Sequence, residues 1–512
     1  MSISALNSYL PKLCAQPRAT RTKAFAQPPT LAILSDPHVL RLAETFEDSI
    51  ASAASSSSPA PPLQKLRDIS SQSLLTTPWP SRKDEPFRFT DTSFIKNSEV
   101  QPVTLAPTPS LDTLSGLADS LFPSIAIIDG YLVDALSNLS ELPEGVFVGR
   151  LSNLNSEVLM EKVAKYVSNF KGDLFWSLNG VGAPDLIIVY VPEGCKVENP
   201  LHLRFISMNW SEKGSKTLPV SNPRVLVLVE KGGEISLVEE YVGGDGDASC
   251  YWTNSVMEVV VGDGAKVSHS YIQTQSLGAA HVKWTSVRQE STSVYELTEV
   301  STGGKLSRHN VHVQQEGPDT VTELSTFHLS IGDQLQDLHS KLVLDHPRGF
   351  SRQLHKVIVA HSLGQAVFDG NVQVNRYAQQ TDAGQLTRSL LLEPRATVNV
   401  KPNLQIIADD VKCSHGAAIS DLEEDQLFYF QARGIDKAAA RKSLIFSFAA
   451  EVVEKFPFVT LQKKVENLIR TLLDPKLPSS EEDFSSYWFC TSCKSGSEHG
   501  GITKENSNVP FD

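Results

Sequence analysis

The chain has 512 residues, with 46 Lys or Arg against 59 Asp or Glu, so its formal net charge is −13. Such a length allows about three ordinary domains, or one long repetitive domain with appendages. The acidic balance excludes a general nucleic-acid binder, which would carry a basic stripe, and no run approaches the ~20 apolar residues of a membrane span. Six cysteines without regular spacing predict a reducing compartment rather than a disulfide framework.

Residues 1–35 differ in composition from the rest of the chain. They contain no Asp or Glu, but carry Lys12, Arg18, Arg21 and Lys23 among Ser, Thr, Ala and Pro. This composition is typical of an organellar transit peptide. Its serine content favours a plastid over a mitochondrion, so we expect the protein in the chloroplast stroma.

Residues 36–180 are expected to form a helical and mixed N-terminal region. Asp36 and Pro37 are the residue types of a helix N-cap and first helical position. The Ala-, Ser- and Pro-rich stretch 51–62 lacks side chains that could build a core, and so predicts a flexible linker. A second short helix is expected over about 63–75.

Short, β-branched apolar segments with glycine-containing turns dominate the chain over residues 185–415. The pattern of an apolar strand, a turn and an alternating strand recurs, while helical periodicity is nearly absent. This monotony favours a β-helix or solenoid over a sandwich. The expected strands are 186–191, 224–229, 235–241, 255–261, 266–273, 294–300 and 321–329.

The end of this β region carries two candidate metal ligands, Cys413 and His415. A thiolate and an imidazole suit iron, zinc or a nascent iron–sulfur cluster. The alternatives are a small buried thiol at Cys413, which is common in protein cores, and an interface histidine with satisfied hydrogen bonds at His415.

A C-terminal helical domain is expected over residues 420–475. Ser420 lies three residues before Glu423, the spacing of a capping box, so a first helix is expected over about 421–432. Asp436 is expected to cap a second helix through about 456, and a third apolar pattern follows over 461–472. Beyond it, the polar stretch 477–512 predicts a disordered tail, and its Cys490-x-x-Cys493 pair is a weak metal or redox signal.

Several segments resemble, in the expected order, members of the SufB/SufD family of the SUF iron–sulfur assembly machinery. Residues 78–91, with Trp79, Phe87 and Phe89 as anchors of an ordered loop, resemble the N-terminal motif of that family. The later matches are 337–340, 351–356, 366–374, 378–392 and 409–434. The likeness covers roughly residues 78–470. It implies a mainly β fold, namely a right-handed parallel β-helix core with an N-terminal helical region and a C-terminal helical domain.

Two positions indicate which branch of the family the chain resembles. Thr387 stands where SufB-type members carry the cysteine that accepts sulfur, and Gly416 stands where they carry a glutamate. A hydroxyl cannot accept persulfide sulfur as a thiolate does. The chain is therefore similar to SufD-type members, which implies that His415 faces the SufB cysteine across a subunit interface.

The resemblance implies a non-catalytic scaffold that assembles nascent iron–sulfur clusters. Its expected partners are a SufB-like scaffold, through the β-helix, and a SufC-like ATPase, through the C-terminal helices; its expected cargo is iron or a transient cluster. The chain has no Walker A motif of its own, and flavin binding is left undecided. The alternatives are a SufB-type sulfur acceptor, which Thr387 and Gly416 oppose, and a secreted β-helix carbohydrate-active enzyme, which the leader composition opposes.

Overall fold

The computed structural model describes residues 36–53, 59–104, 122–167, 170–208, 211–212, 214–243 and 249–473. The segments predicted as a transit peptide (1–35) and a tail with Cys490 and Cys493 (477–512) lie outside the described residues. So do residues 54–58, the middle of the predicted linker.

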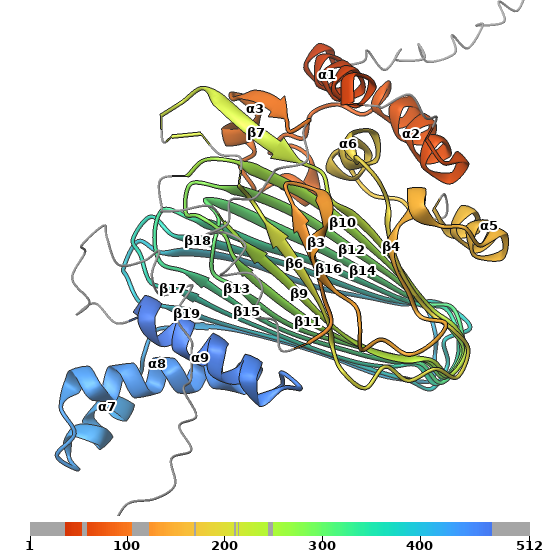
Figure 1. The fold of residues 1–512 in the computed structure, drawn as a ribbon. Helices are drawn as coiled ribbons and strands as arrows, with labels where there is room; N and C mark the ends of the chain where they lie inside the picture. Colours follow the sequence, from red (N-terminus) through yellow and green to blue (C-terminus); the bar gives the residue numbers. More distant parts are fainter. Residues whose placement is uncertain are drawn as a thin grey trace, which may run out of the picture. The chain divides into compact units, whose positions relative to one another are not determined.

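A β-solenoid of about seven turns forms the centre of the molecule (Figure 1). Each turn contributes one strand to each of two sheets, here called sheet A and sheet B. The main ladder of sheet A contains β4 (Phe147–Arg150), β5 (Ile187–Val191), β8 (Arg224–Val229), β10 (Trp252–Val261), β12 (Ala280–Gln289), β14 (Leu306–Gln315), β16 (Leu335–Leu344), β18 (Gln365–Val374) and β20 (Thr397–Ile406). Beside it, β1 (Glu99–Pro102) pairs with β7 (Thr217–Ser221), and β7 pairs with β10.

Sheet B faces sheet A across the interior of the solenoid. It contains β3 (Tyr131–Asn138), β2 (Ser124–Ile128), β6 (Leu201–Ile206), β9 (Glu234–Val242), β11 (Lys266–Thr274), β13 (Val294–Ser301), β15 (Val321–Ser330), β17 (Phe350–Val359), β19 (Thr381–Leu391) and β21 (Val411–Ser420). All pairs in both sheets are parallel except β2 with β3 and β4 with β5. Apolar side chains on the inward faces, such as Val227, Leu237 and Val259, form one continuous core, because successive residues of a strand point to opposite faces.

The turns that join sheet A to sheet B also stack on one another. All of these turns except the last, between β20 and β21, contain one residue in the left-handed region: Gly194, Gly232 and Gly264, then Thr292, Asp319, Arg348 and Gln380. The φ values of these last four residues lie between 56° and 59°. The backbone N–H of each donates to a carbonyl in the next turn, as Thr292 does to Pro318 at 2.9 Å. We call this stack the turn ladder; it keeps every strand in register with the strand one turn away.

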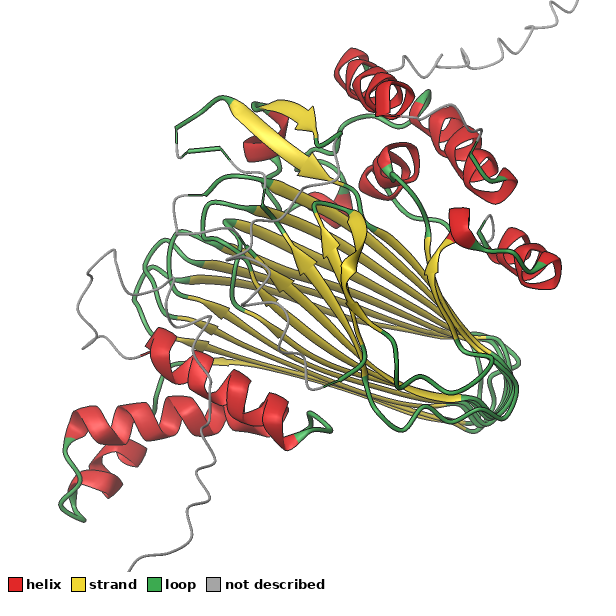
Figure 2. Ribbon diagram, viewed as in Figure 1, coloured by secondary structure: helices red, strands yellow, loops and turns green. Residues whose placement is uncertain are grey.

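Helices cover the outer faces of both sheets (Figure 2). Those from the N-terminal region, α1 (Pro37–Ala53), α2 (Pro61–Leu74), α5 (Glu157–Tyr166) and α6 (Leu174–Gly182), pack on sheet A. The short α3 (Ser93–Lys96) and two 3₁₀ turns, Glu85–Phe87 and Leu151–Asn153, belong to the same region. On sheet B, α8 (Lys437–Val453) and α9 (Val459–Leu473) pack against Ile272, Phe327 and Ile358, and α7 (Glu424–Gln431) precedes them.

The predicted mainly β architecture, with a β-helix core and helices at both ends, is confirmed. Two local predictions were wrong. The linker over 51–62 is shorter, because α1 continues to Ala53 and α2 begins at Pro61. Ser420 does not cap α7: it ends β21, and the helix begins after Glu423. Within the described ranges, no helix is both long enough and apolar enough to cross a bilayer.

Candidate functional site

The last turn of the solenoid in the described part of the chain is formed by β20 and β21 and is here called the terminal coil. No described strand lies on its outer side. Among the described residues, β21 pairs only with β19 and β20 only with β18. Such an edge presents unpaired backbone N–H and C=O groups to whatever approaches it. The terminal coil is therefore the natural place for another chain to pair with this one.

Both predicted ligands lie on the inward face of this last strand. Cys413 is in register with Ala383, and His415 with Gln385, and both of these β19 residues are buried inside the solenoid. Because no further turn of the described chain covers β21, His415 is exposed and Cys413 is only partly buried. The strand thus places a thiol and an imidazole side by side at the open end of the solenoid.

The two side chains differ in their surroundings. Cys413 packs against the apolar core, and burial raises the pKa of its thiol. The backbone of His415 belongs to the ladder between β19 and β21, but its side chain makes no hydrogen bond to another described residue. No third His, Cys, Asp or Glu joins them in a metal-binding arrangement within those ranges, so the described chain alone offers two candidate ligands.

Apolar side chains surround the open end. Ile406 is 45% exposed, Ile407 58% and Ile419 52%, and all three lie in or beside the terminal coil. Val374, the residue of the preceding turn in register with Ile406, is buried by the terminal coil. Exposed apolar groups beside an unpaired strand edge indicate a protein-binding surface.

Polar and charged side chains, not predicted from the sequence, fill part of the solenoid interior. Glu299 accepts hydrogen bonds from His309 and His328, each at 2.9 Å. Burial alone would raise the pKa of Glu299, but the two imidazoles outweigh it and lower that pKa. The ring of His355 stands 5.1 Å from that of His328. Alternation could have revealed these residues, since they share the inward face with apolar neighbours.

A second buried cluster lies nearer the first turns. Glu239 accepts hydrogen bonds from Lys283 of the opposite sheet, from Tyr241 and from His269. Burial favours the neutral form of Glu239, yet Lys283 and His269 lower its pKa. These contacts join sheet A to sheet B through charged groups, in addition to the apolar core.

The N-terminal motif over 78–91 packs on the outer face of sheet A and is hydrogen-bonded to it. Thr90 donates a 2.6 Å hydrogen bond to Asp337, which also accepts from Arg308. Arg308 in turn lies over the ring of Phe87. Trp79 and Phe87 are buried as expected of anchors, but Phe89 is 42% exposed and was wrongly assigned as one.

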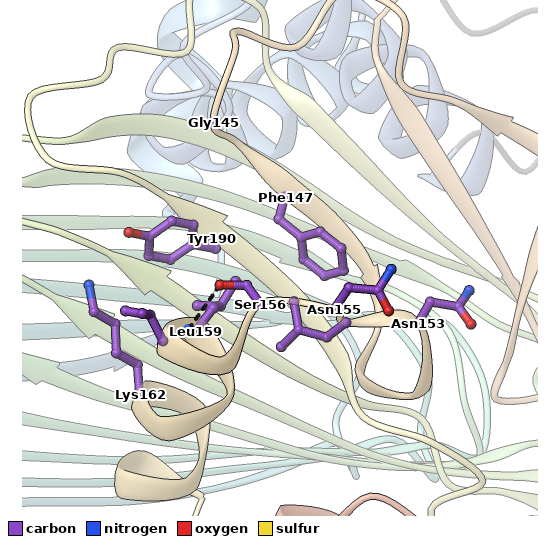
Figure 3. A pocket seen from close by; sticks show the side chains of 10 residues that line it. Gly145, Phe147, Asn153, Asn155, Ser156, Leu159, Lys162 and Tyr190 are labelled. Atoms are coloured by element: carbon purple, nitrogen blue, oxygen red, sulfur yellow. Dashed lines mark hydrogen bonds between the residues drawn. The ribbon is translucent and has the colours of Figure 1, made fainter.

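A cavity of about 390 Å³ lies between β4, β5 and the start of α5 (Figure 3). Two of its polar side chains are engaged: Ser156 caps α5 by accepting from the Leu159 N–H, and Lys162 pairs with Glu230 at 2.6 Å. Lys162 also lies 5.4 Å from the ring of Tyr190. Neither a thiol nor a carboxylate lines this cavity, so it differs in chemistry from the terminal coil.

The C-terminal helices expose aromatic side chains. On α7, Phe428 is 71% exposed and Tyr429 55% exposed, with the Arg433 guanidinium stacked over Tyr429. On α8, by contrast, Val452 and Ala449 are fully buried against sheet B. The helical end is thus anchored by α8 and α9, while α7 presents an aromatic surface to solvent.

Comparisons with known proteins agree with this architecture. The model of the SUF system FeS cluster assembly, SufBD core domain, matches residues 211–448, and that of the SufBD protein N-terminal region matches residues 40–203. Protein ABCI7, chloroplastic, of Arabidopsis thaliana is 61% identical over 91% of this chain and 97% of its own length. An iron–sulfur cluster assembly SufBD family protein of Synechocystis is 35% identical over 76% of this chain and 86% of its own length.

A more distant relative, the iron–sulfur cluster assembly protein SufD of Escherichia coli, is 28% identical over 77% of this chain and 89% of its own length. The two matched regions together span the N-terminal helices, the solenoid and the start of the C-terminal helices. The chain therefore belongs to the SufBD family of iron–sulfur cluster assembly proteins.

Proposed function

We propose that this chain is a SufD-type scaffold subunit, without catalytic activity of its own, that assembles iron–sulfur clusters together with a SufB-like subunit and a SufC-like ATPase. The observation that carries the proposal is the terminal coil, where an unpaired strand edge, exposed isoleucines and two candidate ligands meet. A partner that continued the sheet along β21 would enclose His415 and Cys413 between the two chains.

In this proposal the cluster is a cargo held between subunits. His415 and Cys413 supply ligands from this side, and the SufB-like partner supplies the rest. A neutral imidazole is a labile ligand compared with a thiolate, which suits a cluster that must be released. The raised pKa of Cys413 disfavours its thiolate until a metal displaces the proton, so His415 is the stronger candidate of the two.

The SufD-type assignment is supported by Thr387. This residue lies on the inward face of β19, in register with Ala417 of β21, and its side chain is buried. A hydroxyl at this position can neither accept sulfur nor act as a soft ligand. The name of the Escherichia coli relative agrees with this assignment, and the name of the Arabidopsis relative supports a plastid location.

The first test is co-purification of the chain with SufB-like and SufC-like partners, followed by anaerobic cluster reconstitution. We expect a ternary complex that holds a cluster. Failure to associate with either partner would contradict the scaffold proposal and reopen the other classes of β-helix protein.

The ligand role of His415 has its own test. His415→Ala should leave the ternary complex intact and lower cluster yield by about tenfold or more, since even indirect changes around a metal cost that much. The matched control is His346→Ala, because His346 is also exposed but lies in the turn between β16 and β17. Normal yield with His415→Ala would remove the ligand role while leaving the scaffold proposal standing.

A further inference from the structure

Two glutamine side chains form a short amide ladder directly beneath the terminal coil. Gln385 on β19 donates from Nε2 to Oε1 of Gln353 on β17, at 2.7 Å. Gln353 donates from its own Nε2 to the Ser340 hydroxyl on β16 of the opposite sheet. Both amides are buried inside the solenoid. Their orientation is therefore fixed from below by a residue of sheet A.

This ladder has a direction. Each amide donates to a residue of an earlier strand, so its carbonyl oxygen is left for the following turn. The last oxygen, Oε1 of Gln385, is buried and has no hydrogen-bond partner among the residues that the structure describes. A buried acceptor without a donor is unfavourable and rare in folded proteins. A hydrogen-bond donor from the next turn would satisfy this oxygen.

The next residue in the same register is His415. Neighbouring parallel strands lie about 4.8 Å apart, and both side chains point inward on adjacent strands. The His415 side chain is exposed and has no hydrogen-bond partner among the described residues, so its ring is free to turn toward the Gln385 oxygen. No other residue of β21 is directly above Gln385.

We propose that Gln385 is a positioning residue for His415: its Oε1 accepts the ring N–H of His415 and so selects one tautomer. The other ring nitrogen then carries the lone pair and is presented at the open end of the solenoid. A ligating histidine is commonly oriented by a hydrogen bond at its second nitrogen. The tautomer preference belongs to the chain itself, whereas its use in holding iron or a cluster rests on the proposed function above.

The test compares Gln385→Met with the parent protein, because methionine keeps the length of the side chain and removes the acceptor. Histidine labelled with ¹³C and ¹⁵N in the full chain reports the tautomer of each ring at pH 8, and the His415 signals are assigned by their loss in His415→Asn. We expect one tautomer to dominate in the parent. In Gln385→Met the ratio should fall by about threefold to tenfold, the worth of one hydrogen bond.

Two further variants sharpen this experiment. Gln405→Met is the matched control, since Gln405 points outward from β20 in the same coil and is exposed; it should leave the His415 tautomer unchanged. Gln385→Glu keeps an acceptor oxygen at the same reach and should restore the bias if Gln385→Met loses it. An unchanged tautomer ratio in Gln385→Met would overturn the proposal.

Cluster yield separates this inference from the proposed function. If the ligand role holds, Gln385→Met should also lower yield about tenfold. A normal His415 tautomer in Gln385→Met, together with lost yield in His415→Ala, would overturn the role of Gln385 and keep the ligand. A shifted tautomer together with normal yield in His415→Ala would keep the role of Gln385 and remove the ligand.

Discussion

His281 shows how a single side chain can tie the stability of the solenoid to pH. It is buried between the two sheets, with its Nε2 2.7 Å from the Tyr271 hydroxyl and its Nδ1 without a partner in the described part of the chain. Burial, with a smaller contribution from Lys283, lowers the pKa of His281 to about 3. The folded protein therefore holds this ring neutral at any pH above that value.

Because the unfolded chain protonates the same ring near pH 6.5, it binds more protons than the folded chain between about pH 6.5 and pH 3. Stability is then lost as the pH falls through this window. We expect His281 to account for about 2 kcal/mol of the unfolding free energy lost between pH 7 and pH 5. Urea unfolding at both pH values should show a smaller loss in His281→Gln; an equal loss would contradict this.

Thr292 lowers the stability of the fold in a different way, through backbone strain. It is a β-branched residue in the left-handed region of the turn ladder, with φ 56°. Such a conformation is disfavoured for branched side chains. Its hydroxyl compensates in part by donating to the Ser291 carbonyl at 2.7 Å. Glycine at the same place in the two preceding turns avoids the strain.

Thr292→Asn should raise the unfolding free energy by about 0.5–1 kcal/mol, because asparagine tolerates the left-handed conformation and keeps a polar group there. Denaturant unfolding at pH 7 measures this. Thr397→Asn is the control: Thr397 is exposed but extended, at the start of β20, so the same substitution should be neutral or mildly destabilising.

Among the elements, α7 differs from the two helices that follow it. Its aromatic side chains face solvent, whereas α8 and α9 are packed on sheet B. Under the proposed docking of a SufC-like ATPase, Phe428→Ser should weaken co-purification of that subunit by about 30-fold, a typical effect for a central aromatic residue. The unfolding free energy of the chain should hardly change.

Val459→Ser provides the comparison for this element. Val459 begins α9 and is 61% exposed, so it tests whether removal of any exposed apolar side chain weakens docking. Equal losses with both variants would argue against a specific role for α7.

At the scale of elements, much of the fold could be predicted from the sequence. Strands such as 224–229 and 266–273 agree with β8 and β11 to within a residue, because alternation and β-branching are local signals. Ser420 was assigned to a helix cap because its spacing to Glu423 fits, but pairing of β21 with β19 extends the strand through it. The hydrogen bonds of the strand ladder therefore outweighed the local capping preference of Ser420.

The candidate site could be predicted only in part. Cys413 and His415 were found from their residue types and motif, and alternation places them on one face. Neither the amide ladder of Gln353 and Gln385 beneath His415 nor the buried pair of Glu239 and Lys283 could be found in this way. Both depend on which residues of distant strands share a register, and register is fixed by the stacking of whole turns rather than by any local pattern.

On the scale of the whole molecule, the contact between the N-terminal motif and sheet A joins residues far apart in the sequence. Asp337 is fully buried; burial would raise its pKa, but His339 and Arg308 lower it. Asp337→Ala would leave the buried Arg308 guanidinium without its carboxylate. We expect a loss of about 3–5 kcal/mol in unfolding free energy.

Denaturant unfolding measures the Asp337 effect, and limited proteolysis near Thr90 should show that the N-terminal motif is released. Asp382→Ala is the control, since Asp382 pairs with Arg352 in an exposed ion pair on the extended strand β19, which contributes at most about 1 kcal/mol. A similar small loss at Asp337 would mean that apolar packing alone holds the motif in place.

The unpaired edge of the terminal coil also determines where this molecule is weakest. In a stacked array each inner turn is held by two neighbours, but the last turn is held by one. Opening should therefore begin at β20 and β21 and proceed inward, at a free energy well below that of global unfolding. His415 thus lies where the isolated chain frays most readily, and a subunit bound along β21 would slow amide exchange there before it slowed exchange anywhere else.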